Sequence, residues 1–206
     1  HEKTLGQLFC DGSALQIVRM LTSAFAEAGG ELRLGVTIGE ISAGDGFTVE
    51  TSSGVLRCSS LVVATGGKSI PRMGASGLGY RIAARFGLPL TETRPALVPL
   101  VFSGADLEGM RALAGVSVRA RVACNGASFD EGLLFTHRGL SGPSVLQISS
   151  HWREGAALSV DLAPGQDVAA HLRSVRETSP RTTLRTALTR FLPDRLAAAA
   201  AARAGS

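Results

Sequence analysis

The residues best suited to chemistry lie in one glycine-rich segment. It begins with Ala64, Thr65, Gly66 and Gly67, which carry no side chain larger than a hydroxyl-bearing threonine. Two consecutive glycines let a ligand approach the backbone closely, and their N–H groups can face an anion. A tight turn without any ligand would use the same residues. The pattern therefore favours a backbone-lined binding site and a plain turn about equally.

The elements on either side decide where these glycines would lie. Residues 60–65 are apolar without alternation, which is typical of a parallel strand buried on both faces. Residues 78–86 predict a helix, and ligands in open α/β sheets bind at the carboxyl ends of such strands. Two phosphate-binding motifs are excluded. A Walker A loop would need its first glycine at position 62, which is Val62. Residues 74–79 read GxxGxG, which is the reverse of the GxGxxG dinucleotide-binding motif.

His137 is the histidine in the most suggestive place, between Thr136 and a Gly-Leu-Ser-Gly-Pro turn. It could act as a general acid or base if it reached a substrate. The favoured alternative is that Thr136 and His137 hydrogen-bond the turn and have a structural role. Ser141 has no acidic partner or second histidine at motif spacing, so a hydrolase triad is not supported. The three cysteines are far apart and form no CxxC, so we expect neither a metal site nor a disulfide.

The sequence pattern first predicts alternating helices and strands, then mainly strands, and finally helices. Short β-type segments broken by Gly, Pro and Asn run from 96 to 162, which predicts a compact antiparallel sheet or barrel. Proline at the expected first helical position supports the last two helices. The predicted elements are helices over 13–28, 78–86, 167–177, 180–191 and 193–203, a strand over 31–36, a meander over 38–43, 46–51 and 54–58, and the strand over 60–65.

Composition bounds the class of protein. Of the 206 residues, 45% are hydrophobic and spread along the chain, so a packed core is expected. The formal charge of +4 is a mild excess, and the arginines after residue 170 are interpreted as solvated helix faces. With one Trp and one Tyr, we expect no nucleic-acid partner. No apolar run approaches the roughly 18 residues of a membrane span, and no signal peptide is recognised, so we expect no membrane partner and a cytoplasmic location.

Five segments resemble, in the same order, a flavoprotein family of NAD(P)/FAD-dependent oxidoreductases that includes aminoacetone oxidases and BaiN-like reductases. The resemblance spans nearly the whole chain, and the FTHxGLSGP string is its most specific part. The segments are GQLFCDGSA (6–14), ATGGKSIPRMGASGLGY (64–80), RPALVPLV (94–101), LLFTHRGLSGPSVLQIS (133–149) and FLPDRLA (191–197).

The resemblance implies an α/β fold (α+β overall) in three parts. A partial glutathione-reductase-like FAD-binding domain would cover 1–93, an inserted antiparallel β-barrel-like domain 94–165, and the helical part of the insert 166–206. The resemblance also implies an internal fragment, which lacks the N-terminal GxGxxG segment and the C-terminal FAD segment of the same polypeptide. The opening at His1 and the end just after a helix indicate a fragment independently.

The resemblance also assigns a cofactor and a site. FAD would be bound, with NAD(P)H as a candidate second cofactor, and hydride or electrons would pass between a small-molecule substrate and FAD, with NAD(P)H or oxygen as partner. The alternative is a non-catalytic module that binds no cofactor by itself. The sequence departs from the family at Leu78, where an acidic residue is usual, and at Arg138, where an aromatic is usual. The implied site comprises Ile38, Ala64, Thr65, Gly66 and Gly67 at the cofactor, and Ser69, Gly74, Ser76, Gly77, Thr136 and Ser141 near cofactor or substrate, with His137 as the catalytic candidate.

Overall fold

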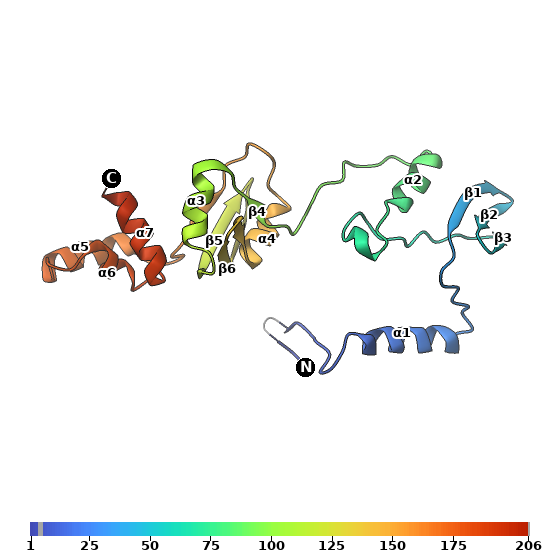
Figure 1. The fold of residues 1–206 in the computed structure, drawn as a ribbon, viewed down its shortest axis with the longest axis horizontal. Coiled ribbons are helices and arrows are strands. Elements are labelled where there is room, and N and C mark those ends of the chain that lie inside the picture. Colours follow the sequence, from blue (N-terminus) through green and yellow to red (C-terminus); the bar gives the residue numbers. More distant parts are fainter. Residues whose placement is uncertain (4–5, 206) are drawn as a thin grey trace. The chain divides into compact units, whose positions relative to one another are not determined.

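The computed structural model describes residues 1–3 and 6–205, and it divides the chain into two units (Figure 1). The first unit is His1–Thr91 and the second is Glu92–Ser206. Each unit is described by itself.

The first unit is built around a small antiparallel sheet with the strand order β1-β2-β3. The predicted meander is therefore confirmed. Ile41 and Val49 pair across β1 and β2, and both are buried, because alternate side chains of the two strands point to the same face. The elements of this unit are α1 (Leu15–Glu27), β1 (Ile38–Gly44), β2 (Gly46–Thr51), β3 (Gly54–Cys58), a 3-10 turn at Pro71–Met73 and α2 (Leu78–Arg85).

Helix α1 confirms the predicted helix, but it buries none of its residues. Leu15, Leu21 and Phe25 lie at helical spacing and are 46–59% exposed. An apolar stripe at this spacing is the side by which a helix normally packs. Within the described part of the chain, this stripe therefore remains uncovered.

The predicted strands over 31–36 and 60–65 are wrong, because both segments are irregular in the structure. A strand exists only when a neighbouring strand pairs with its backbone N–H and C=O groups. No described strand lies beside either segment. Val62, expected to be buried on a central strand, is 86% exposed. The apolar pattern of these two segments is thus typical of buried strands, but the described residues provide neither a partner strand nor burial.

The second unit contains a curled, fully antiparallel sheet with the strand order β4-β7-β6-β5-β8, which confirms the predicted antiparallel sheet. Its longest pairing, β5 with β6, turns at Asn125 and Gly126, with φ of 48° and 81°. Positive φ at both positions is the geometry that Asn-Gly adopts most readily in hairpins. The strands are β4 (Leu100–Val101), β5 (Ser117–Cys124), β6 (Ala127–Thr136), β7 (Gly139–Ser141) and β8 (Ser159–Asp161).

Helices cover this sheet and share its core. Val145 and Ile148 of α4 are fully buried in the same cluster as Val122 and Leu133 of the sheet. The cluster continues through Leu196 into the C-terminal helices, so these belong to the same packed unit. The mixed α/β fold with a half-barrel and a helical part is therefore confirmed. The helices are α3 (Gly104–Ala112), α4 (Pro143–Ser149), α5 (Val168–Thr178), α6 (Leu184–Leu188) and α7 (Asp194–Ala204).

Helix α6 begins later than the sequence predicts. Thr183 is its N-cap, and Thr183 Oγ1 accepts a hydrogen bond from the amide of Thr186 at 3.2 Å. Ser179, which directly precedes the predicted helix over 180–191, instead belongs to a turn, in which its carbonyl accepts from the amide of Thr182. Both residues have the hydroxyl that favours a helix start, so local pattern alone does not distinguish them.

We expect Ser149→Ala to lower the free energy of unfolding by about 1–2 kcal/mol, because it leaves a backbone amide without its partner. Ser149 is only 5% exposed. Its Oγ accepts from the amide of Val98 at 3.0 Å and donates to the carbonyl of Leu146 at 2.7 Å. Urea unfolding followed by the fluorescence of Trp152, the single tryptophan, measures the effect. The exposed neighbour Ser150 is the control, and an equal loss for Ser150→Ala would contradict the assignment.

Candidate functional site

The predicted cofactor segment, Ala64–Gly67, forms irregular backbone between β3 and α2. Gly66 has a φ of 69°, in the left-handed region that glycine adopts without strain. A Cβ placed on Gly66 meets no atom within 4 Å, so its backbone faces open space. The amides of this segment make no hydrogen bond to the described residues. The segment therefore presents unpaired N–H groups on an open surface.

This segment folds against the start of α2. A Cβ on Gly79 would lie 2.8 Å from Oγ1 of Thr65 and 3.6 Å from Cγ1 of Val63, so only glycine permits this approach. A Cβ on Gly67 would lie 3.4 Å from the hydroxyl of Tyr80. The N-terminus of a helix carries a partial positive charge. The glycine segment and the positive end of α2 thus form one surface.

The loop between them is held by side-chain contacts. Nζ of Lys68 lies 5.3 Å from the ring centre of Tyr80, within the range of a cation–π contact. Arg81 donates to the carbonyl of Ser76 at 2.8 Å. Gly77, the N-cap of α2, is buried with a φ of 68°. Gly77 therefore lies beside Lys68 and Tyr80, whereas Ser69, Gly74 and Ser76 are exposed.

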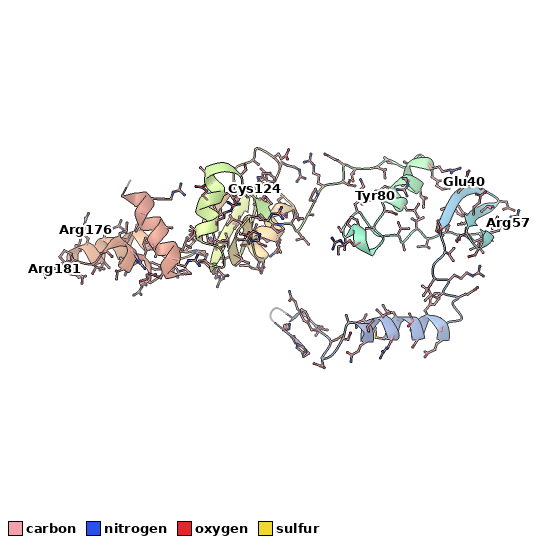
Figure 2. The ribbon with its side chains drawn as sticks, in the orientation of Figure 1. Glu40, Arg57, Tyr80, Cys124, Arg176 and Arg181 are labelled. Atoms are coloured by element: carbon pink, nitrogen blue, oxygen red, sulfur yellow. The ribbon has the colours of Figure 1, made fainter. Side chains whose placement is uncertain are left out.

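Ile38 lies at the start of β1, where it pairs with Thr51. The other end of α2 contacts this sheet, because Arg85 forms an ion pair with Glu40 of β1. Figure 2 shows Tyr80 on α2 and Glu40 on β1. The sheet and the glycine segment are thus connected through α2, and among the described residues no hydrogen bond joins Ile38 directly to Ala64–Gly67.

Thr136, His137 and Ser141 belong to the β6–β7 hairpin of the second unit. Thr136 Oγ1 donates to the carbonyl of Gly139 at 3.0 Å and accepts from the amide of Arg138 at 3.2 Å. His137 is exposed, and its ring forms no hydrogen bond with the described residues. Thr136 therefore holds the turn without help from His137, and Ser141 pairs with Leu134 as part of the sheet.

The remainder of the same motif serves packing. Gly142 has a φ of 94°, and a Cβ on it would lie 2.6 Å from the carbonyl oxygen of Gly132. Ser144 is fully buried, and its hydroxyl donates to that same oxygen at 3.1 Å. The Gly-Leu-Ser-Gly-Pro-Ser string is thus a close joint between β6, β7 and α4, and its unusual composition has a structural cause.

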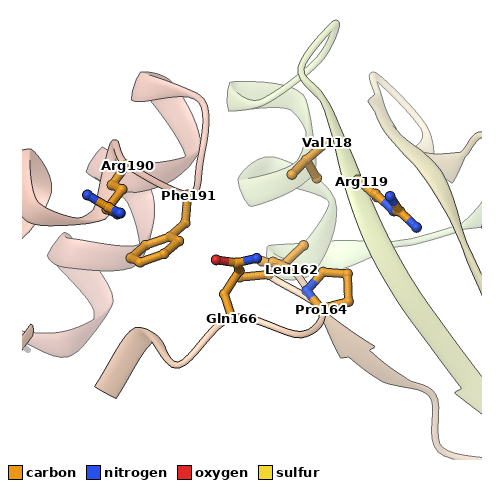
Figure 3. Close-up of a pocket in the computed structure, with 8 residues that line it drawn as sticks. Val118, Arg119, Leu162, Pro164, Gln166, Arg190 and Phe191 are labelled. Atoms are coloured by element: carbon orange, nitrogen blue, oxygen red, sulfur yellow. The ribbon is translucent and has the colours of Figure 1, made fainter. Parts of the chain in front are cut away.

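A groove of about 620 Å³ lies between the half-barrel and the helical part of the second unit. Figure 3 shows Phe191 from the segment between α6 and α7 near Gln166 and Pro164 from the loop after β8. Arg119 lines the other side, and it is already engaged in an ion pair with Asp130 at 2.9 Å.

Asp130 forms ion pairs with both Arg119 and Arg121. Hydrogen bonds from Arg119 and Arg121, together with their charges, lower the pKa of Asp130. A depressed pKa in the folded state contributes stability above the unfolded value, about 4, and this stability is lost as pH falls through the folded pKa. We expect Asp130→Asn to flatten the fall in melting temperature below about pH 4. An unchanged melting profile in that range would show that the ion pairs do not contribute.

Comparison with known proteins decides the family. Residues 94–206 match the family described as the HI0933-like protein barrel and H2TH domain. The chain belongs to the HI0933-like family. This family lies in the superfamily of FAD-dependent oxidoreductases, so the resemblance found in the sequence is confirmed at that level. Among the described residues, no helix has the length and apolar character needed to span a membrane.

Two curated relatives extend the match to the first unit. The chain is 46% identical over 198 residues to a protein of Escherichia coli (strain K12) and 40% identical over 202 residues to one of Haemophilus influenzae, both named ribosomal RNA dihydrouridine synthase. The alignments cover 95% of this chain and 50% of each relative. The chain thus spans about half the length of the curated relatives it matches.

The expectation of no nucleic-acid partner is wrong, because these relatives are named for ribosomal RNA. That expectation interpreted the arginines after residue 170 as solvated helix faces and relied on the scarcity of aromatic residues. The helical part 166–206 contains seven arginines and three acidic residues, so the positive charge is concentrated there. The signal was thus visible in the sequence, but its interpretation was wrong, since nucleic-acid binding depends on where basic residues gather.

Proposed function

We propose that the chain is part of a flavin-dependent enzyme that reduces uridine in ribosomal RNA to dihydrouridine. The observation that carries this proposal is the 46% identity, over 95% of the chain, with a ribosomal RNA dihydrouridine synthase. Membership of a family within the FAD-dependent oxidoreductases supports the redox chemistry. Dihydrouridine differs from uridine by one hydride and one proton added across the C5=C6 bond of the base.

The residues of the first unit fit one wall of an FAD site. The open backbone at Gly66, the unpaired amides of Ala64–Gly67 and the positive end of α2 suit an anionic cofactor. Thr65 lies against Gly79, which fixes the wall in place. When bound and reduced, FAD would supply the hydride. Because the reaction consumes electrons, NAD(P)H suits it as the ultimate donor and oxygen does not.

The proton requires a separate donor. His137 is the candidate, because its ring is exposed and forms no hydrogen bond with the described residues. An imidazole ring can deliver a proton in general acid catalysis. Thr136 would keep the turn that presents this ring in one conformation.

One experiment tests the function. Ribosomal RNA from a strain that lacks the gene is incubated with the full-length protein and NADPH, and its nucleosides are analysed by mass spectrometry. We expect a yellow protein and a uridine that gains two hydrogen atoms, with no change when NADPH is omitted. A yellow protein that leaves the RNA unchanged would overturn the RNA substrate. A protein that binds no flavin would overturn the redox function.

The second candidate concerns the isolated chain, which we infer to be a folded module that binds FAD weakly or not at all. The uncovered apolar stripe of α1 and the unpaired segment 60–65 support this inference. Visible absorbance of the isolated chain, beside that of the full-length protein, tests it. Stoichiometric FAD binding by the isolated chain would contradict it.

A further inference from the structure

Five of the seven arginines of the helical part fall into two groups. Arg185 forms an ion pair with Asp194, and Arg195 donates to the carbonyls of Ala112 and Ala114, so both join elements of the fold. The first group is therefore structural. The second group, Arg173, Arg176 and Arg181, is exposed and forms no ion pair with the described residues.

Arg173, Arg176 and Arg181 gather at one place, which we call the α5–α6 arginine surface. Arg173 and Arg176 are one helical turn apart on α5 and line a groove with Pro180 and Thr182. Arg181 lines the adjoining hollow, which also includes Pro180 and Thr182. Figure 2 shows Arg176 and Arg181 at the same end of the helical part, where α5 leads to α6.

The charges of this surface are unbalanced. Glu177 is the acidic residue next to it along the chain, and it is exposed and forms no ion pair with the residues described. Like charges held close together repel, so a bound anion stabilises such a cluster. The guanidinium groups present forked donors that match phosphate oxygens, and the hydroxyls of Ser179 and Thr182 can add hydrogen bonds.

We propose that the α5–α6 arginine surface binds the phosphate backbone of ribosomal RNA. This inference rests on the proposed function and adds the place where the substrate is held, within the second unit. The contact positions RNA without reading its sequence, because phosphates are the same along every strand. A lipid surface fits less well, because residues 173–183 include no aromatic side chain and one apolar one of medium size, Val175.

Binding of a labelled ribosomal RNA fragment to the full-length protein tests this proposal. The triple variant Arg173→Ala, Arg176→Ala and Arg181→Ala is titrated by fluorescence anisotropy at several salt concentrations. We expect its affinity to fall roughly tenfold or more near physiological salt. The slope of log affinity against log salt should decrease by about 1 for each phosphate that the variant no longer neutralises. The corresponding triple lysine variant should retain most of the slope, because lysine binds phosphate as a point charge.

The matched control removes three exposed arginines elsewhere, Arg19, Arg57 and Arg111. The control should bind RNA as the wild type does, and melting curves should show that all variants remain folded. Equal RNA binding by the α5–α6 triple alanine variant and the control variant would overturn the role of the α5–α6 arginine surface. The proposed function would be unaffected by that result. Wild-type protein that binds no RNA would overturn the proposed function, and this inference with it. Weakened binding to anionic vesicles, with RNA binding unchanged, would assign the surface to lipid and overturn the inference.

Discussion

Gly139→Ala is expected to lower the stability of the second unit by about 3–5 kcal/mol, among the larger effects of a single substitution. Gly139 has a φ of 145°, and a Cβ there would lie 2.1 Å from the carbonyl oxygen of Leu100 and 2.8 Å from the ring of Phe102. Leu100 lies in β4, and Phe102 directly follows it. Relief of the clash requires β4 to move, which breaks its pairing with β7 at Val101 and Gly139.

Gly155→Ala is the control for this prediction. Gly155 also has a positive φ, 85°, but a Cβ there meets no atom within 4 Å. It should lose about 1 kcal/mol, which is the cost of the left-handed backbone alone. Urea unfolding of each variant, followed by the fluorescence of Trp152, separates the two contributions. Equal losses of stability would show that the close contact with β4 is not the reason why position 139 requires glycine.

Gly66→Val is expected to reduce the flavin content of the full-length protein by roughly tenfold or more, which a loss of about 1.4 kcal/mol in binding would cause. The backbone of Gly66 faces open space, so the valine side chain would occupy the volume through which a cofactor reaches the amides of Ala64–Gly67. A Cβ at this position meets no atom of the described residues within 4 Å, so a steric clash with the fold is not the expected cause.

Gly87→Val is the matched control, because Gly87 has a φ of 68° and also has no atom within 4 Å of a Cβ. Both variants carry the same backbone penalty, and only Gly66→Val should lose flavin. The ratio of visible to ultraviolet absorbance, together with the melting temperature, is measured for each. Unchanged flavin content in Gly66→Val would show that the loop does not face the cofactor. Loss in both variants would point to a general weakening of the unit.

Some elements could be predicted because their hydrogen bonds are local. The β1–β3 meander and the helices α1, α2, α5 and α7 pair backbone groups that are close in sequence, so composition and spacing suffice. The segment 60–65 could not be predicted in the same way. Its apolar pattern has the composition of a buried strand, but strand formation depends on a partner that the described residues do not include.

The candidate site also combines features set by the local sequence with features set by residues distant in the sequence. The sequence by itself determined that residues 64–67 form a glycine-rich backbone with small side chains, and the structure showed that Gly66 faces open space. Only the tertiary structure decided that Gly139 packs on Leu100 and that Gly142 and Ser144 meet Gly132, because those partners lie about ten to forty residues away. It likewise decided that Arg173, Arg176 and Arg181 gather at one surface, since the chain must turn after α5 before Arg181 can lie beside the other two.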